Sequence, residues 1–270
     1  MLGSDVLTEC VKVFGHDSVI GYSHEELDIT SKQSIRFAFN SSQPQFVINC
    51  AAYTNVDSAE IYRNEAHEIN VLGAENLAHM CRESDAKLIH FSTDQVFDGM
   101  SNRPWIETDK PNPLNYYAQT KWEGEMRVMS QGDHIIIRVQ WLYGQKKERF
   151  TQLKGKKIFT PFSDQRGAPT WTRNIAQVIP KLLGSQGIFH FAYDDSASWT
   201  DVYQYVKETM GYSVTLEPKK TEEAKLPATR PLYCVMSNGK LKKELKVSTL
   251  GSWRVALAEF LEILSTDPQL

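Results

Sequence analysis

Short apolar runs alternate along this chain with longer segments in which apolar residues recur every three or four positions. Phe46–Tyr53, Lys87–Phe91 and His134–Gly144 are continuous apolar runs bounded by polar or turn residues, a pattern typical of buried strands. Asp57–Ser84 and the segment that begins near Leu114 have helical spacing. Strands and helices that alternate in this way predict a parallel sheet covered by helices on both faces, a doubly wound α/β fold.

The same pattern extends toward both ends of the chain. Residues 1–14 predict a helix, His16–Ser23 a short strand and Lys32–Asn40 a second helix. Beyond residue 144 the pattern is less regular, so we predict that residues 145–270 form a smaller lobe, interleaved with a larger sheet domain of residues 1–144. The elements predicted there are a loop over Phe162–Thr172, helices over Asn174–Leu183, Trp199–Met210 and Trp253–Leu264, and strands over Gly187–Tyr193 and Val214–Lys220.

Side chains capable of proton transfer gather where one predicted strand ends and the next helix begins. Lys87–Phe91 leads into Thr93 and Asp94, and Tyr117 and Lys121 stand four apart on one face of the helix that follows. Ligands of such sheets bind at the carboxyl ends of the strands. A phenol beside an ammonium group releases its proton more readily than free tyrosine, whose pKa is about 10. These side chains therefore predict a proton-donating site for the reduction of a carbonyl group by hydride.

The Tyr-x-x-x-Lys spacing has little specificity by itself, because a chain with 11 tyrosines and many lysines contains it by chance. For an isolated match, an interfacial aromatic residue and a solvated lysine are the better interpretation. Only the first match in this chain follows a strand that ends in Ser-Thr-Asp and also opens a helix, so only that match is predicted to be functional. The matches are Tyr117/Lys121, Tyr143/Lys147 and Tyr203/Lys207.

Composition narrows the possible partners and compartments. The 270 residues are 41% hydrophobic and 23% charged, as in an ordinary globular protein. The net charge of −3 gives no reason to expect nucleic acid or an anionic membrane as a partner. No apolar stretch approaches the roughly 20 residues that span a bilayer, and the N-terminal residues do not resemble a signal peptide, so we expect a cytoplasmic protein. The four cysteines lack C-x-x-C pairing and are expected to be reduced; the seven histidines lack ligand spacing and predict no metal site.

Several segments also match, in order, the motifs of one enzyme family. They are ELDIT, VINCAAYTNVDSAE, INVLGAENLA, LIHFSTDQVFDG, NPLNYYAQTKWEGE, IIRVQWLYG, DQRGAPTWT and the Arg-Pro pair at position 230. By these segments the chain resembles the extended short-chain dehydrogenase/reductases and, within them, the dTDP-4-dehydrorhamnose reductase family. The resemblance implies a Rossmann-like fold, with residues 1–144 as the dinucleotide-binding domain and residues 145–270 as the substrate-binding lobe.

The resemblance implies NADPH- or NADH-dependent reduction of the 4-keto group of a dTDP-linked deoxysugar, of the type that converts dTDP-4-dehydrorhamnose to dTDP-rhamnose. Tyr117 would give its proton to the ketone oxygen as general acid, and Thr93 would donate a hydrogen bond to the same oxygen. Lys121 would lower the pKa of the phenol and hold the nicotinamide ribose. Ser23 and His24 stand where NAD-specific sites carry an acid, which favours NADPH, but the family uses both cofactors. The choice of cofactor therefore stays open.

The resemblance also assigns binding residues along the whole site. The sugar would contact Thr93, Asp94 and Trp141. The nucleotide end of the substrate would contact Gln165, Pro169, Thr170 and Arg230. We expect a monomer or a homodimer. The cofactor would be lined by Gly3, Asp28, Ile29, Ala51, Ala52 and Tyr53 as well as by Tyr117 and Lys121, with Asn70 supporting the backbone of the site.

The chain departs from the family pattern at three places. Gln95 and Gln140 replace a tyrosine and a serine that are usual near the sugar, so the exact sugar stays open. The family opens with a strand and a G-x-x-G-x-x-G turn that holds the pyrophosphate, and here only Met1-Leu2-Gly3 matches the end of that motif. We therefore expect strands with unpaired edges and poor binding of nicotinamide cofactors by this chain.

Two alternatives to a reductase follow from the same residues. One is a non-catalytic regulatory subunit that resembles the beta subunit of methionine adenosyltransferase, which shares the fold and acts by binding a partner enzyme. The other is an inactive relative that lacks the N-terminal strand. The retained DQRGAPTWT segment and Trp141 favour the reductase, because both belong to the sugar side of the site.

Overall fold

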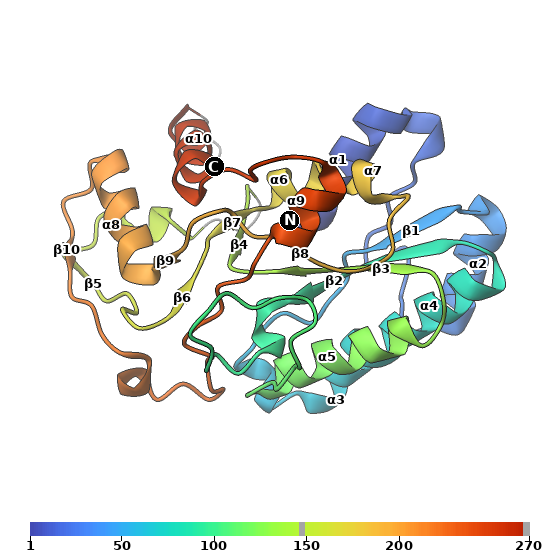
Figure 1. Ribbon diagram of the computed structural model, residues 1–270, viewed down its shortest axis with the longest axis horizontal. Coiled ribbons are helices and arrows are strands. Elements are labelled where there is room, and N and C mark those ends of the chain that lie inside the picture. The colour runs from blue at the N-terminus through green and yellow to red at the C-terminus, as the bar shows by residue number, and fades with distance from the viewer. Residues whose placement is uncertain (146–148, 267–270) are drawn as a thin grey trace.

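A central parallel sheet with helices on both faces organises the molecule (Figure 1). The computed structural model describes residues 1–145 and 149–266. Within these ranges, β1 (Phe46–Asn49), β2 (Lys87–Thr93), β3 (His134–Val139) and β8 (Gly187–His190) form a four-stranded sheet in the order β1-β2-β3-β8, and all neighbours are parallel. This architecture confirms the predicted α/β fold.

Alternate residues of the strands build two separate apolar layers, as the two-residue period of a strand requires. Leu88 and Ile136 point into one cluster, whereas Ile89 and Ile135, each one position away, point into the other. Helices cover both layers (Figure 1). On the side of Leu88 these are α2 (Lys32–Ser42), α3 (Arg63–His67), α4 (Ala74–Glu83) and α5 (Tyr116–Met129); on the side of Ile89 they are α1 (Leu2–Phe14), α6 (Thr172–Ala176), α7 (Ile179–Leu182) and α9 (Gly239–Leu245).

The helix predicted over Asp57–Ser84 is broken into several pieces. A short 3-10 helix and α3 are followed by the π-helix Glu68–Gly73, which then runs into α4. Gly73 lies so close to Ile29 that an added Cβ atom would approach the isoleucine side chain to 2.6 Å. The wider π-turn also places Asn70 toward the end of β1, where it serves the candidate site.

The strand predicted over His16–Ser23 is not formed. A 3-10 turn spans His16–Ser18, and residues 19–23 have no regular structure; Ile20 is 61% exposed. An extended segment becomes a strand only when a neighbour accepts its ladder of hydrogen bonds. Among the described strands, none pairs with the outer edge of β1, which would be the neighbouring position. The expected unpaired strand edge is therefore present at β1.

A second group of elements lies beside the sheet, at the left of Figure 1. The predicted helices at Trp199 and Trp253 are confirmed as α8 (Trp199–Met210) and α10 (Trp253–Thr266). The helix predicted over Asn174–Leu183 is split before Pro180, whose ring and missing N–H interrupt a helix. β8 comes from this later part of the chain but belongs to the central sheet, so the boundary at residue 144 stays a prediction. The elements are β4 (Leu142–Tyr143) with β7 (Thr170–Trp171), β5 (Ile158–Phe159) with β10 (Thr215–Leu216), β6 (Arg166–Gly167) with β9 (Ala197–Ser198), α8 (Trp199–Met210) and α10 (Trp253–Thr266).

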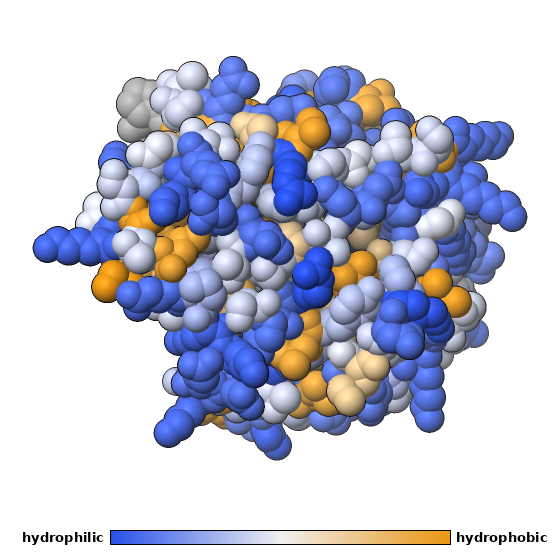
Figure 2. All heavy atoms as spheres, turned by 60° about the vertical axis from the view of Figure 1, so that its left-hand side comes forward, coloured by the Kyte–Doolittle hydropathy of each residue, from blue (hydrophilic) through white to orange (hydrophobic). Residues whose placement is uncertain are grey.

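Hydrophilic side chains dominate the surface on this side, with apolar residues in small separate groups (Figure 2). None of the described helices combines the length and the apolar character that a membrane span requires. The part of the chain that the structure covers contains no cluster of three or more histidine, cysteine or acidic side chains arranged to hold a metal ion.

Candidate active site

The end of β2 and the start of α5 are joined by one side chain, Asn115. Its Oδ1 atom accepts a hydrogen bond from the Ala118 backbone N–H at 2.8 Å, which caps α5. Its Nδ2 atom donates to Gln95 Oε1 at 3.0 Å and to the Thr229 carbonyl oxygen at 2.9 Å. Asn115 therefore fixes where α5 begins relative to both the strand end and the distant segment around residue 229.

Thr93, Asp94 and Tyr117 meet at this junction, and all three are buried. The Thr93 hydroxyl donates to Asp94 Oδ1 at 2.9 Å, and the same side chain lies close enough to the Tyr117 phenol to influence its pKa. The fold thus brings together the hydroxyl, the carboxyl and the phenol that the sequence placed on separate elements. Together they form a small polar cluster at the carboxyl end of β2.

The pKa of Tyr117 is raised to about 12, chiefly because burial disfavours the phenolate, and the nearby Asp94 carboxylate adds to the rise. The nearby Thr93 hydroxyl acts in the opposite direction. The expected lowering of this pKa by Lys121 is not found. The Lys121 Nζ atom is directed instead at the Phe91 carbonyl oxygen, to which it donates at 2.7 Å.

Lys121 is fully enclosed, and burial lowers its pKa to about 8, although the Glu125 carboxylate opposes this shift. Glu125 itself forms a buried ion pair with Arg138 of β3 at 2.7 Å. The ammonium form of Lys121 is therefore only weakly favoured near neutral pH, unlike that of an exposed lysine with a pKa near 10.4.

Asp94 is the third group whose ionisation the site alters. Burial raises the pKa of its carboxyl to about 7, and hydrogen bonds from Thr93 and from the Cys234 thiol limit the rise. Asp94 in turn raises the pKa of Cys234, after the larger effect of burial. Near neutral pH this carboxyl can therefore either donate or accept a hydrogen bond toward a ligand.

The predicted cofactor residues lie along the carboxyl end of β1. Ala51, Ala52 and Tyr53 follow the strand directly, and Asn70 holds Tyr53 through both its backbone N–H (2.9 Å) and its carbonyl oxygen (3.1 Å). Gly3, in the first turn of α1, approaches the same strand end, because an added Cβ atom would lie 3.3 Å from Cys50 Cβ. The N-terminus of α1 thus lies beside these residues, as a phosphate-binding helix requires.

Asp28 and Ile29 have their side chains engaged within the protein. The Asp28 carboxylate accepts hydrogen bonds from the Thr30 N–H and hydroxyl groups at 2.9 and 2.8 Å, which lowers its pKa. The Ile29 side chain packs into the core beside α2 and α4. Neither side chain contacts the cluster around Tyr117, so their expected contact with an adenine stays a prediction.

The predicted sugar and nucleotide residues form a second wall. Trp141 has a left-handed backbone (φ 43°) and stacks on Trp199 with ring centroids 4.1 Å apart. Thr170 donates its N–H to the Trp141 carbonyl oxygen at 3.1 Å, while its hydroxyl donates to the Ala168 carbonyl oxygen. Pro169 and Thr170 are buried, so they shape this wall more than they offer polar groups to a ligand.

Arg230 lines a pocket of about 530 Å³ and pairs with Asp57 at 2.8 Å. Gln165 is buried behind the pocket and donates to the Thr221 hydroxyl at 3.0 Å. The two residues therefore converge on one place although 65 positions separate them in the chain. The pocket is lined by Asp164, Lys220, Thr221, Glu222, Lys225, Leu226, Ala228, Thr229, Arg230 and Leu232.

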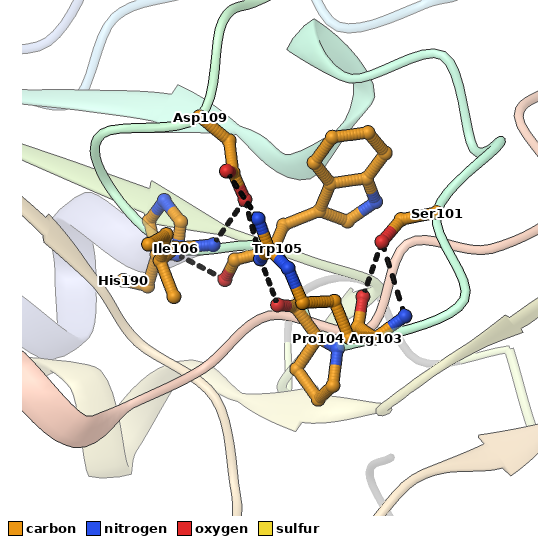
Figure 3. Close-up of polar contacts among 7 residues, drawn as sticks. All are labelled: Ser101, Arg103, Pro104, Trp105, Ile106, Asp109 and His190. Atoms are coloured by element: carbon orange, nitrogen blue, oxygen red, sulfur yellow. Dashed lines mark hydrogen bonds and ion pairs between the residues drawn. The ribbon is translucent and has the colours of Figure 1, made fainter.

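The Pro-rich loop after β2 lies against His190 of β8 (Figure 3). Arg103 and Asp109 form an ion pair at 2.7 Å within the loop, and the Trp105 carbonyl oxygen lies 3.2 Å from His190 Nδ1 of β8. The Trp105 ring nitrogen donates to the Tyr233 carbonyl oxygen at 2.9 Å. The loop therefore anchors the segment that contains Cys234, whose thiol lies next to Asp94.

Comparison with known proteins identifies the family. The RmlD substrate binding domain matches residues 1–266. The chain is 32% identical to a dTDP-4-keto-6-deoxy-D-glucose reductase of Streptomyces niveus, over 99% of this chain and 95% of the relative. The chain belongs to the RmlD substrate binding domain family. Another relative is a dTDP-4-dehydrorhamnose reductase of Mycolicibacterium smegmatis, 32% identical over 94% of this chain and 80% of the relative.

Solved structures of RmlD-family proteins share the whole fold. A dTDP-4-dehydrorhamnose reductase of Clostridium acetobutylicum superposes with a TM-score of 0.92 at 33% identity, covering 98% of this chain and 96% of that one. A dTDP-4-dehydrorhamnose reductase of Bacillus anthracis, solved in complex with NADP, gives a TM-score of 0.91 at 29% identity, with coverage of 97% and 95%.

The two glutamines that depart from the usual RmlD-family pattern are both engaged within the protein. Gln95 Oε1 accepts from Asn115, and Gln140 Oε1 accepts from the Ala168 N–H at 3.1 Å. Gln140 thereby holds the loop that carries Pro169. Both residues support neighbouring segments, and the identity of the sugar stays open.

Several residues of the site could not be predicted from the sequence. Lys220 and Lys225 add positive charge to the pocket, but in the sequence they resemble any solvated lysine. Asn49 and His90 lie behind Lys121. Their only signal was the placement of two polar side chains inside apolar strands, where a polar group must find a partner. Lys147, of the second Tyr-x-x-x-Lys match, lies outside the described residues.

Proposed function

We propose that this protein reduces the 4-keto group of a dTDP-linked deoxysugar, with NADPH or NADH as the reductant. The observation that carries the proposal is the buried cluster of Thr93, Asp94 and Tyr117 at the carboxyl end of β2, in a member of the RmlD family. The reduction of dTDP-4-dehydrorhamnose to dTDP-rhamnose is the leading form of this reaction.

Tyr117 would act as the general acid of the reaction. With its pKa raised to about 12, the phenol keeps its proton at neutral pH and can pass it to an oxygen that gains negative charge. Thr93 would hold that oxygen by a hydrogen bond, and Asp94 would bind a hydroxyl of the sugar. The reduced nicotinamide, when bound, supplies the hydride.

The residues present fit the nicotinamide half of such a cofactor. Ala51 and Ala52 carry only methyl side chains, so a flat ring can approach the end of β1 closely. Asn70 holds the neighbouring backbone in place. Lys121, directed at the Phe91 carbonyl oxygen, retains further N–H groups for the ribose hydroxyls.

The other end of the substrate would lie in the pocket lined by Arg230. Lys220, Lys225 and Arg230 bring positive charge to it, which suits the diphosphate of a dTDP-sugar, although Asp164 and Glu222 share the same pocket. Asp164 is engaged by the Thr221 N–H and hydroxyl groups, and Arg230 by Asp57. Lys220 and Lys225 are therefore the cations best placed to bind the diphosphate.

The proposal is tested by mixing the purified protein with dTDP-4-dehydrorhamnose and NADPH at up to millimolar concentration and following the absorbance of NADPH. We expect consumption of NADPH that depends on the sugar and not on dTDP alone, with a dTDP-6-deoxyhexose as product by mass spectrometry. Melting curves complete the test, because a ligand stabilises the folded state by mass action. No turnover, together with a melting shift produced only by methionine adenosyltransferase, would favour the regulatory subunit instead.

A further inference from the structure

A chain of buried polar contacts runs from the end of β1 to Lys121. The Ala51 N–H donates to Asn49 Oδ1 at 3.0 Å, Asn49 Nδ2 lies 3.1 Å from His90 Nδ1, and His90 Nε2 lies 3.3 Å from Lys121 Nζ. Asn49, His90 and Lys121 are 4%, 1% and 2% exposed. Groups so deeply buried have few partners besides one another, so each contact constrains the next.

The backbone at Ala51 determines which way this chain of contacts is oriented. Because the Ala51 N–H must meet the Asn49 carbonyl oxygen, the amide NH₂ group of Asn49 faces His90 and donates to its Nδ1 atom. A neutral imidazole that accepts at Nδ1 carries its proton at Nε2. The His90 ring therefore presents an N–H group to Lys121.

That N–H group discriminates between the two forms of the lysine. An ammonium group has three donors and no acceptor, so it cannot accept a hydrogen bond from the His90 N–H and repels it. A neutral amine offers a lone pair that can accept this hydrogen bond. Charging the imidazole gives no relief, because burial and the neighbouring Lys121 lower the pKa of His90 far below its usual value. The Phe91 carbonyl oxygen accepts from either form of the lysine.

Burial is the largest cause of the lowered pKa of Lys121, and the charges around it offer its ammonium form little compensation. Glu125 is the acid that favours the ammonium form, and it is already paired with Arg138. The remaining ion pairs of α5, which link it to α3 and α4, are on its solvent side. The titratable groups around Lys121 are Tyr117 and Glu125 on its own helix, His90 and Asp94 on and after β2, and Arg138 on β3, with His67–Glu123 and Glu75–Arg127 as the solvent-side pairs.

We propose that Asn49 and His90 are positioning residues that present an N–H group to Lys121 and thereby favour its uncharged amine over its ammonium form. Lys121 then changes its protonation state near neutral pH, one helical turn from Tyr117. The effect of this on turnover rests on the proposed function, but the protonation state of Lys121 does not.

The tautomer of His90 is tested first, in the unaltered protein, by ¹⁵N NMR of the imidazole nitrogens with His90→Phe to assign the signals. We expect a protonated Nε2 and an unprotonated Nδ1 across neutral pH. A proton on Nδ1 would overturn the proposal without any variant having to fold.

The ionisation of Lys121 is tested next, by ¹³C NMR of protein labelled at lysine Cε, with Lys121→Arg to assign its signal. Asn49→Leu removes the donor to Nδ1, which frees His90 to move its proton to Nδ1 and to accept from the ammonium at Nε2. We expect the Lys121 pKa to rise by at least about one unit, a tenfold change in its ionisation constant. Asn238→Leu, which removes another buried amide, next to Ala192, serves as the control and should leave the Lys121 pKa unchanged.

An unchanged Lys121 pKa in a folded Asn49→Leu protein would contradict the proposal. The pH profile of kcat separates this result from the proposed function. A shifted Lys121 pKa with an unmoved rate profile supports the present inference and contradicts the role of Lys121 in the reduction.

Discussion

Tyr117 and Tyr143 are both buried tyrosines followed four residues later by a lysine, but their hydroxyl groups have different surroundings. Tyr117 meets Thr93 and Asp94, whereas the Tyr143 hydroxyl has no hydrogen-bond partner among the described residues. Burial raises the pKa of both phenols, so the ionisation of the phenol does not distinguish them. The contact with a hydroxyl and a carboxyl that face a ligand site is what distinguishes Tyr117.

Replacement of Tyr117 by phenylalanine should lower kcat by at least about 100-fold, the low end for general acid catalysis, because the proton for the substrate oxygen is lost. Cofactor binding should survive, since the phenol acts in the transition state. Steady-state kinetics at saturating dTDP-sugar and millimolar NADPH measure this effect.

Tyr143→Phe and Tyr203→Phe are the matched controls for this prediction. Tyr143→Phe removes a hydroxyl with no partner in the described structure, and Tyr203→Phe removes one that accepts from Gln152 at 2.5 Å. Both should keep nearly full activity, with a loss of about 0.5–1.5 kcal/mol of stability at Tyr203. Similar losses of activity at all three tyrosines would mean that the spacing is coincidental.

Asp94 should make the stability of the protein depend on pH. Its pKa is about 7 in the folded protein and about 3.9 in the unfolded chain, so between these values the folded state binds the extra proton. Stability contributed by Asp94 is therefore present below about pH 4 and is lost as pH rises to about 7, on the order of 4 kcal/mol in all.

Asp94→Asn removes this titration. The difference in the free energy of unfolding between the variant and the unaltered protein therefore reports Asp94 alone. The buried histidines, whose lowered pKa values change stability in the opposite direction, contribute equally to both proteins. Urea unfolding at several pH values should show the stability of the variant, relative to the unaltered protein, increasing from pH 4 to pH 7. A constant difference over this range would show that Asp94 ionises normally.

Among the elements, β1 and β8 are the two edge strands of the four-stranded sheet, and β1 is the one that leads into the predicted cofactor residues. Its outer edge has no partner strand in the described structure, and Phe46 is 40% exposed. The loss of each buried hydrogen bond would cost about 1–3 kcal/mol, but Val47 and Ile48 are only half-buried, so water reaches part of this edge. The open edge therefore costs less stability than a fully buried one would.

Periodicity predicted the elements well where local pattern and tertiary packing agree. α8 and β2 lie where their apolar patterns placed them, because each buries one continuous face or run. The strand at His16–Ser23 failed because a strand also needs a neighbour, which no local pattern can supply. The π-helix at Glu68–Gly73 could not be predicted from periodicity, because it depends on the contact of Asn70 with Tyr53, 17 positions away.

In the whole molecule, the candidate site depends on residues from distant parts of the chain. Thr229 accepts from Asn115, and Cys234 lies against Asp94, so the segment near residue 230 completes a site that begins at β2. Spacing within one motif could predict Tyr117 and Lys121 but not these contacts, nor the contact of Lys121 with His90. Each of them arises only when the sheet and the later segments pack together.

The stack of Trp141 on Trp199 gives the molecule an optical reporter. The two indoles come from the loop after β3 and from the start of α8, and they lie nearly parallel at 14°. Rings in such contact couple their electronic transitions, which produces a paired signal in near-ultraviolet circular dichroism and alters their fluorescence. Any movement of α8 away from the sheet would separate the rings and remove that coupling. Any such movement could therefore be followed in solution by light alone, without an attached dye.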